Sequence, residues 1–62
     1  MKIKITEEYS GRTIKDWLYE NGVSRALITR LKKTEDGITL NGAHATVRKP
    51  MSEGDILSLD IS

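Results

Sequence analysis

The sequence predicts a small α+β domain in which a pair of helices packs on a short, mostly antiparallel β-sheet. Three observations lead to this class. Apolar and polar residues alternate near both ends of the chain, apolar residues recur at helical spacing between residues 13 and 33, and an Asn-Gly pair at residues 41–42 indicates a hairpin. A chain of 62 residues has room for a single domain with a thin core.

The first expected element is a short edge strand. Residues 2–6 read Lys-Ile-Lys-Ile-Thr, and this alternation has the period of two that a half-buried strand requires. Ile3 and Ile5 should therefore face the core.

Two short helices are expected to follow and to pack as a pair. Thr13 and Asp16 resemble a capping box, so the first helix should begin near residue 12 or 13 and end at Asn21-Gly22. Ser24 is a good N-cap for a second helix that runs to about Lys33. The predicted buried stripes are Ile14, Trp17 and Leu18 in the first helix, and Leu27, Ile28 and Leu31 in the second.

Beyond Asp36-Gly37 the pattern changes to that of strands. Residues 38–40 alternate and run into Asn41-Gly42, the strongest short hairpin signal, so Ala45 to Arg48 should form the returning strand. Residues 52–55 form a second expected turn. The last strand, within residues 56–61, is expected to turn Leu57, Leu59 and Ile61 toward the core.

Positive charge is concentrated between Ser24 and Lys49. This segment contains six of the ten basic residues and two of the nine acidic ones, whereas the rest of the chain contains four basic and seven acidic residues. The local charges are therefore +4 and −3, which the net charge of +1 conceals. Such asymmetry indicates a surface for a polyanion, with affinity supplied by phosphate contacts.

A helical projection of residues 24–33 places polar side chains opposite the apolar stripe, at a spacing suited to a phosphate backbone. The alternative is an ordinary solvated face, and charge alone does not separate the two. The Ser24 hydroxyl is similarly either an N-cap, which we favour, or a phosphate ligand. The outward set consists of Arg25, Thr29 and Lys32 on one line, Lys33 beside them, Arg30 on the flank, and Arg48 and Lys49 beyond the hairpin.

The order and spacing of several short motifs resemble the RNA-binding domain named for ribosomal protein S-four, across nearly the whole chain. The motifs are GRTIKDWL at residues 11–18, VSRALITRLKK at 23–33, ITLNG at 38–42, and VRK at 47–49 followed by EGDI at 53–56. The resemblance implies an αL-type fold in which the second helix and the following β-loop form one RNA-contacting surface. The contacts that it implies are Ser24, Arg25, Thr29, Lys32, Lys33, Asn41, Gly42, Arg48 and Lys49.

One segment departs from that pattern. Many relatives connect the second helix to the strand by a short basic or Gly-containing turn, whereas residues 34–37 read Thr-Glu-Asp-Gly. The two acids lie near the expected RNA surface. They would either pair with Lys33 or repel phosphate.

The wider sequence looks most like the N-terminal domain of RluA/RluD-like ribosomal large-subunit pseudouridine synthases. In those enzymes an Asp in an Arg-Leu-Asp motif engages the target uridine in a separate catalytic domain, and no such motif occurs here. Residues 1–62 are therefore expected to be one RNA-binding domain, the N-terminal fragment of a larger isomerase, with no catalytic residue of its own. Heat-shock and ribosome-rescue relatives of the same fold, some of them nearly this small, keep a free-standing protein open as an alternative.

Other chemistry finds little support. His44 lacks clustered ligands and is expected to be a turn residue, so we expect no metal and no cofactor. Trp17 should pack in the core instead of stacking on bases, while Tyr19 is undecided. The chain has no Cys and no apolar run near the ~20 residues that cross a bilayer, so we expect a cytoplasmic protein without a membrane partner. We also expect a monomer, with no small-molecule substrate for this domain.

Three hypotheses remain. The chain docks structured RNA, ribosomal by the resemblance, for an attached domain that converts uridine to pseudouridine. Alternatively, it is an independent RNA-binding protein of the same fold that acts on ribosomes. In the third hypothesis its basic face meets an acidic protein.

Overall fold

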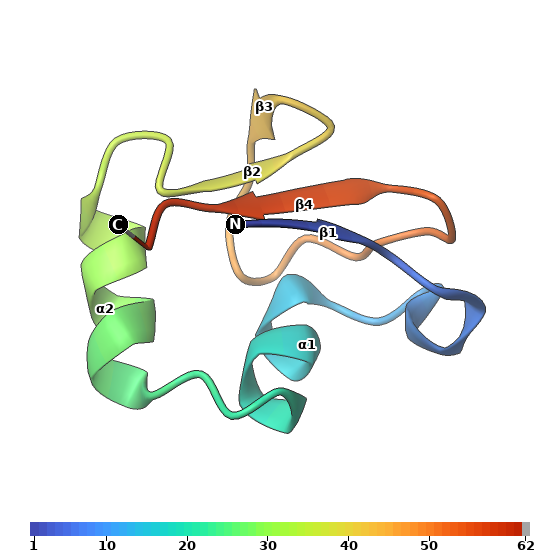
Figure 1. Ribbon diagram of the computed structural model, residues 1–62, viewed down its shortest axis with the longest axis horizontal. Coiled ribbons are helices and arrows are strands. Elements are labelled where there is room, and N and C mark those ends of the chain that lie inside the picture. The colour runs from blue at the N-terminus through green and yellow to red at the C-terminus, as the bar shows by residue number, and fades with distance from the viewer. Residues whose placement is uncertain (62) are drawn as a thin grey trace.

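The computed structural model describes residues 1–61 and confirms the α+β class, with two α-helices beside a four-stranded antiparallel sheet. The strand order is β1-β4-β2-β3, so the last strand lies between the first and the second, and both helices lie on the same side of the sheet (Figure 1). The elements are β1 (Lys2–Lys4), the 3-10 turn η1 (Glu7–Tyr9), α1 (Ile14–Glu20), α2 (Arg25–Lys33), β2 (Ile38–Leu40), β3 (Ala43–His44) and β4 (Ile56–Leu59).

The core lies between the sheet and the two helices. Its buried members from the sheet side and the loops are Ile5, Ile38, Leu40, Ala45, Met51, Leu57 and Leu59, and those from the helices are Ile14, Trp17, Leu18, Ile28 and Leu31. The predicted helical stripes are thus confirmed, with Leu27 packed at the edge. The expectation for Ile61 was wrong, because β4 ends at Leu59 and the Ile61 side chain is 40% exposed.

Side-chain caps begin both helices where the sequence indicates. The Thr13 hydroxyl accepts a hydrogen bond from the Asp16 N–H at 3.3 Å, and the Ser24 hydroxyl accepts one from the Leu27 N–H at 3.2 Å. Each bond satisfies a backbone donor that has no partner within the helix. Gly22, with φ of +76°, provides the left-handed residue that ends α1.

The hairpin forms at Asn41-Gly42, but its second strand is not where we expected it. Both turn residues have positive φ, 54° and 81°, which is the pattern of a type I′ turn. The turn pairs Leu40 with Ala43, so β3 occupies Ala43–His44 directly after it. The predicted returning strand at Ala45–Arg48 was therefore wrong.

Residues 46–51 leave the sheet because their backbone carbonyls accept hydrogen bonds from the first turn of α1. The Lys15 N–H donates to the Val47 carbonyl at 2.8 Å, and the Ile14 N–H donates to the Lys49 carbonyl at 3.0 Å. These are two of the N–H groups that the first turn of a helix leaves without intrahelical partners. The loop that carries Arg48 is thereby fixed against the start of α1.

Gly37 sets the distance between the end of α2 and the start of β2. A Cβ atom at this position would lie 2.4 Å from the Leu31 carbonyl oxygen, which leaves no room for a side chain. The Gly37 N–H donates to the Thr34 carbonyl at 3.0 Å, and the Gly37 carbonyl accepts from the Asp60 N–H at 2.9 Å. The helix end, β2 and the end of β4 therefore meet at one glycine.

Candidate nucleic-acid interface

The outer face of α2 is built by the same periodicity that buries its inner face. Ile28 and Leu31 enter the core, so the residues between and beside them project outward. All the polar residues of this helix that the sequence assigned to RNA are exposed: Arg25, Thr29, Arg30, Lys32 and Lys33.

The cations of α2 have no anionic neighbours on their own helix. The nine residues of α2 include no Asp or Glu, and within residues 1–61 no salt bridge involves any of its four basic side chains. Arg30, Lys32 and Lys33 lie in the last turn, where a cation is favourable to the helix dipole. Arg25 lies in the first turn, where the dipole disfavours a cation, so helix stability does not account for its charge.

The loop after β3 brings a further cation beside α2. A groove of about 400 Å³ separates the end of α2 from this loop, with Lys32 on one element and Arg48 on the other. Its lining residues are Leu31, Lys32, Ile38, His44, Ala45, Thr46, Val47 and Arg48. Lys32 and Arg48, which are distant in sequence, therefore share one surface.

The other predicted contacts beyond α2 lie around a second hollow, past β3. Asn41 and Lys49 line it together with Asp55. The Asn41 side chain is already engaged, since its amide NH2 donates to Asp55 at 3.0 Å and its oxygen accepts from the Ile56 N–H at 2.9 Å. Gly42 lies at the exposed tip and offers only its backbone.

Hydrogen bonds lower the pKa of Asp55 and so favour its ionised form. The Asn41 amide and the Ser52 N–H donate to its carboxylate, and these bonds, with a smaller contribution from the charge of Lys49, hold the pKa of Asp55 below its ordinary value. Lys49 thus faces an ionised carboxylate, unlike the cations of α2.

The acids of the turn after α2 do not neutralise Lys33. No salt bridge joins Lys33 to Glu35 or Asp36 in the part of the chain that the structure describes. Asp36 instead points to the hairpin, where its carboxylate lies 3.8 Å from the His44 Nδ1 atom. Of the two outcomes that we considered, pairing with Lys33 is absent.

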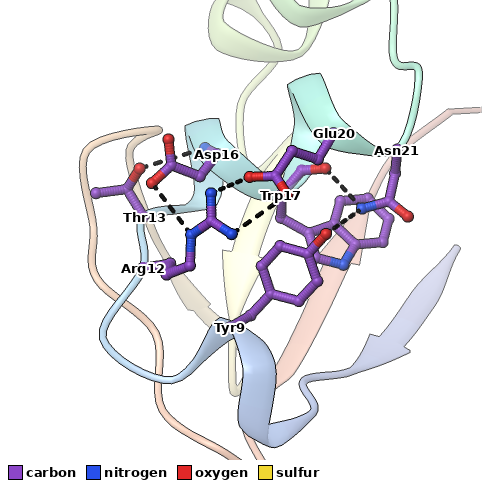
Figure 2. Close-up of polar contacts among 7 residues, drawn as sticks. All are labelled: Tyr9, Arg12, Thr13, Asp16, Trp17, Glu20 and Asn21. Atoms are coloured by element: carbon purple, nitrogen blue, oxygen red, sulfur yellow. Dashed lines mark hydrogen bonds and ion pairs between the residues drawn. The ribbon is translucent and has the colours of Figure 1, made fainter.

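Arg12 shows a different arrangement on the other side of the domain. Figure 2 shows its guanidinium between the carboxylates of Asp16 and Glu20, with the Tyr9 ring beside it. The Asp16 contact spans 3.8 Å, and the guanidinium lies 5.3 Å from the Tyr9 ring centre. The hydrogen bond to Glu20 is the main reason that the pKa of Arg12 is raised.

The structure confirms the core position of Trp17 and shows that Tyr19, which the sequence left undecided, is exposed. Trp17 is 9% exposed and belongs to the core, whereas Tyr19 is 48% exposed and has the Lys15 ammonium 5.8 Å from its ring centre.

His44 and Thr46 line the groove beside Lys32, although the sequence analysis included neither among the expected RNA contacts. Only their proximity to the hairpin signal could have indicated them.

Residues 1–61 contain neither a metal cluster nor a membrane-spanning helix. No group of three or more His, Cys, Asp or Glu side chains in this range is placed to hold a metal ion. Neither of its α-helices has the length and apolar character that crossing a membrane requires.

Comparisons with known proteins agree with the family resemblance of the sequence. The family described as the RluD ribosomal pseudouridine synthase N-terminal domain matches residues 1–57. An uncharacterized RNA pseudouridine synthase of Bacillus subtilis, YjbO, is 38% identical over 45 residues, which cover 73% of this chain and 16% of that protein. No solved structure matches the chain at a significant level. The chain belongs to the family of N-terminal domains of RluD-type ribosomal pseudouridine synthases.

Proposed function

We propose that this domain docks structured ribosomal RNA for an attached pseudouridine synthase domain. The observation that carries the proposal is the unpaired positive surface formed by Arg25, Arg30, Lys32 and Lys33 of α2 with Arg48 of the neighbouring loop. We call this set the basic surface. Exposed cations without internal partners are free to neutralise phosphates and release counterions.

We assign the chemistry of uridine isomerisation to a separate domain outside residues 1–62. The matched segment covers 16% of the length of the B. subtilis relative, which leaves ample chain for a separate domain. The carboxylates of three Asp residues all have neighbours within the domain: Arg12 for Asp16, His44 for Asp36, and Asn41 and Ser52 for Asp55. We therefore propose that residues 1–62 form the N-terminal RNA-binding part of a cytoplasmic enzyme.

Phosphate contacts determine where and how the RNA lies, rather than its sequence. Arg25 and Lys32 are seven residues apart on α2, or about 10 Å along the helix axis. Thr29 lies between them on the same face and can donate a hydrogen bond to a phosphate oxygen. A row of this kind follows one RNA strand.

The first test is a titration of labelled ribosomal RNA fragments with the 62-residue domain at two salt concentrations, followed by NMR shift mapping. Engagement of ~3 to 5 phosphates predicts a log-log salt slope of roughly −2 to −4. The shifts should concentrate on residues 24–33 and 41–49. Absence of binding at low salt would contradict the proposal, and binding to an acidic protein that RNA does not compete away would assign the basic surface to a protein partner.

A charge-reversed variant tests the location of the surface. Arg25→Glu combined with Lys32→Glu should reduce RNA affinity by on the order of 100-fold or more while the fold persists, because both side chains point away from the core. The matched control is Lys2→Glu with Lys4→Glu, which changes the net charge equally on the edge strand β1. Equal losses in both variants would mean that net charge, not the basic surface, determines binding.

A further inference from the structure

We propose that the groove between α2 and the loop after β3 binds the base of an unpaired nucleotide, so that the domain prefers RNA with a bulge or loop over a continuous helix. This inference rests on the proposed RNA-docking function and adds to it a site that receives a base. The site is the groove of about 400 Å³ described above. Its size falls in the range of roughly 300 to 1,000 Å³ that small-ligand sites occupy.

The floor of the groove is apolar. Leu31 and Ile38 lie beneath the groove and are only 1% and 3% exposed, so the apolar surface open to a ligand comes mainly from the half-buried Val47, with a small part from Ala45. Methyl groups of this kind pack well against the flat face of a base, which is the least polar part of a nucleotide. A continuous RNA helix keeps its bases stacked and cannot offer that face.

The rim of the groove is positive and polar. Lys32 lies on the α2 side and Arg48 on the loop side, and no Asp or Glu is among the lining residues. A nucleotide has the matching chemistry, because its base is apolar on its faces and the phosphates on either side of it are anionic. The two cations are thus placed to hold the flanking phosphates.

His44 and Thr46 supply groups that a base can use. The Thr46 hydroxyl has no intramolecular hydrogen-bond partner within residues 1–61, so it can donate to or accept from a base edge. His44 is exposed at the mouth of the groove, and its ring can stack on a base. Asp36 lies beside this ring, with its carboxylate 3.8 Å from His44 Nδ1, just outside the groove lining.

The loop wall is already in place before a ligand arrives. The Val47 carbonyl accepts from the Lys15 N–H of α1 at 2.8 Å, and the Lys49 N–H closes the loop on the Thr46 carbonyl at 3.1 Å. A fixed wall reduces the ordering cost of binding. The groove is therefore a preformed site and does not require the loop to fold around the RNA.

The test compares two RNA hairpins with the same stem, one fully paired and one with a single bulged adenosine. Wild-type protein should bind the bulged hairpin about tenfold more tightly, as one stacked base allows. The variant His44→Ala with Thr46→Ala should lose this preference yet bind the paired hairpin as wild type does. Two controls outside the groove, Thr29→Ala and Arg25→Gln, should keep the preference, and Arg25→Gln should weaken binding to both hairpins equally.

A direct readout locates the base. Methyl-labelled protein should show NMR contacts from Ala45 and Val47 to protons of the bulged adenosine, and none from the core residue Leu57. Equal, salt-sensitive affinity for both hairpins would overturn the base site while leaving RNA docking intact. Loss of binding to both hairpins at low salt would overturn both proposals, and a preference without these contacts would place the bulge elsewhere. Displacement of the contacts by an acidic, leucine-containing peptide, with hairpin affinity unchanged, would assign the groove to a protein.

Discussion

Arg12 and Arg25 are both exposed arginines near the start of a helix, but their surroundings differ. Arg12 is held by Asp16 and Glu20 and lies against Tyr9, as Figure 2 shows. Arg25 has no acidic residue on its own helix and no ion pair within the described residues. The first cation is used inside the molecule, whereas the second is available to a partner.

This difference carries more information than the charge count of either region. Three of the four cations of α2 are favourable to the helix dipole, but none has an acidic partner on the helix that would lower the repulsion among them. A polyanion removes that repulsion when it binds. Surface ion pairs such as those of Arg12 are weak individually, but here they connect the segment before α1 to two turns of that helix.

The largest effect should come from moving α2 itself. Gly37→Ala would place a methyl group against the Leu31 carbonyl, and we expect a loss of about 1 to 3 kcal/mol of unfolding free energy. A domain of 62 residues has roughly 3 to 9 kcal/mol in total, so this is a substantial fraction. Denaturant unfolding measures it, and RNA affinity should fall with it because the basic surface shifts.

The control for this substitution is Glu35→Ala in the same turn, where an exposed side chain is removed without a clash. We expect a change within about 0.5 kcal/mol. A Gly37→Ala protein with wild-type stability would show that the backbone adjusts and that α2 is not fixed at this point.

Removing one arginine from each region tests the contrast between them. Arg25→Gln should weaken RNA binding roughly tenfold at low salt and reduce the salt slope by about 1, without lowering the melting temperature. Arg12→Gln should lower the melting temperature and leave RNA affinity and its salt slope unchanged. Its ion pairs and its contact with Tyr9 are lost, while the basic surface is untouched. Equal effects of the two variants on RNA binding would remove the distinction.

Much of this fold was predictable because short-range rules dominate it. The caps at Thr13 and Ser24, the stop at Gly22 and the turn at Asn41 depend on neighbouring residues, and all were predicted correctly. The returning strand was misplaced because its fate depends on a distant element. Nothing near Val47 indicates that its carbonyl accepts from the start of α1.

The candidate site divides in the same way. The outer face of α2 follows from helical periodicity, so the exposure of Arg25 and Lys32 could be predicted from the sequence alone. The groove could not, since its walls come from α2 and from a loop that leaves the sheet. Asn41 was assigned to RNA by resemblance, yet its side-chain amide donates to Asp55 and accepts from the Ile56 N–H. Only the tertiary structure reveals this internal role.

A smaller effect should separate the two roles considered for Ser24. Ser24→Ala removes the cap on the Leu27 N–H and should cost about 1 kcal/mol of stability, with the RNA salt slope unchanged. Ser24→Asp keeps a cap and adds negative charge beside Arg25, so stability should be retained while RNA affinity decreases. A reduced salt slope in Ser24→Ala would instead make this hydroxyl a phosphate ligand.

The smallest expected effect is on the pH dependence of stability and comes from Asp55, which has both internal hydrogen bonds and the cation Lys49 beside it. Because hydrogen bonds from Asn41 and Ser52 lower its pKa in the folded state, its contribution to stability is complete above the ordinary Asp pKa of about 3.9 and is lost as the pH falls through the folded pKa. Melting temperature measured from neutral to acidic pH should therefore fall more steeply for wild type than for Asp55→Asn. Asn41→Ala, which removes the main donor, should flatten the profile in the same direction. If the melting-temperature profiles of these variants run parallel to that of wild type, the hydrogen bonds to Asp55 contribute nothing to stability in solution. Lys49 would then belong with the free cations of the basic surface.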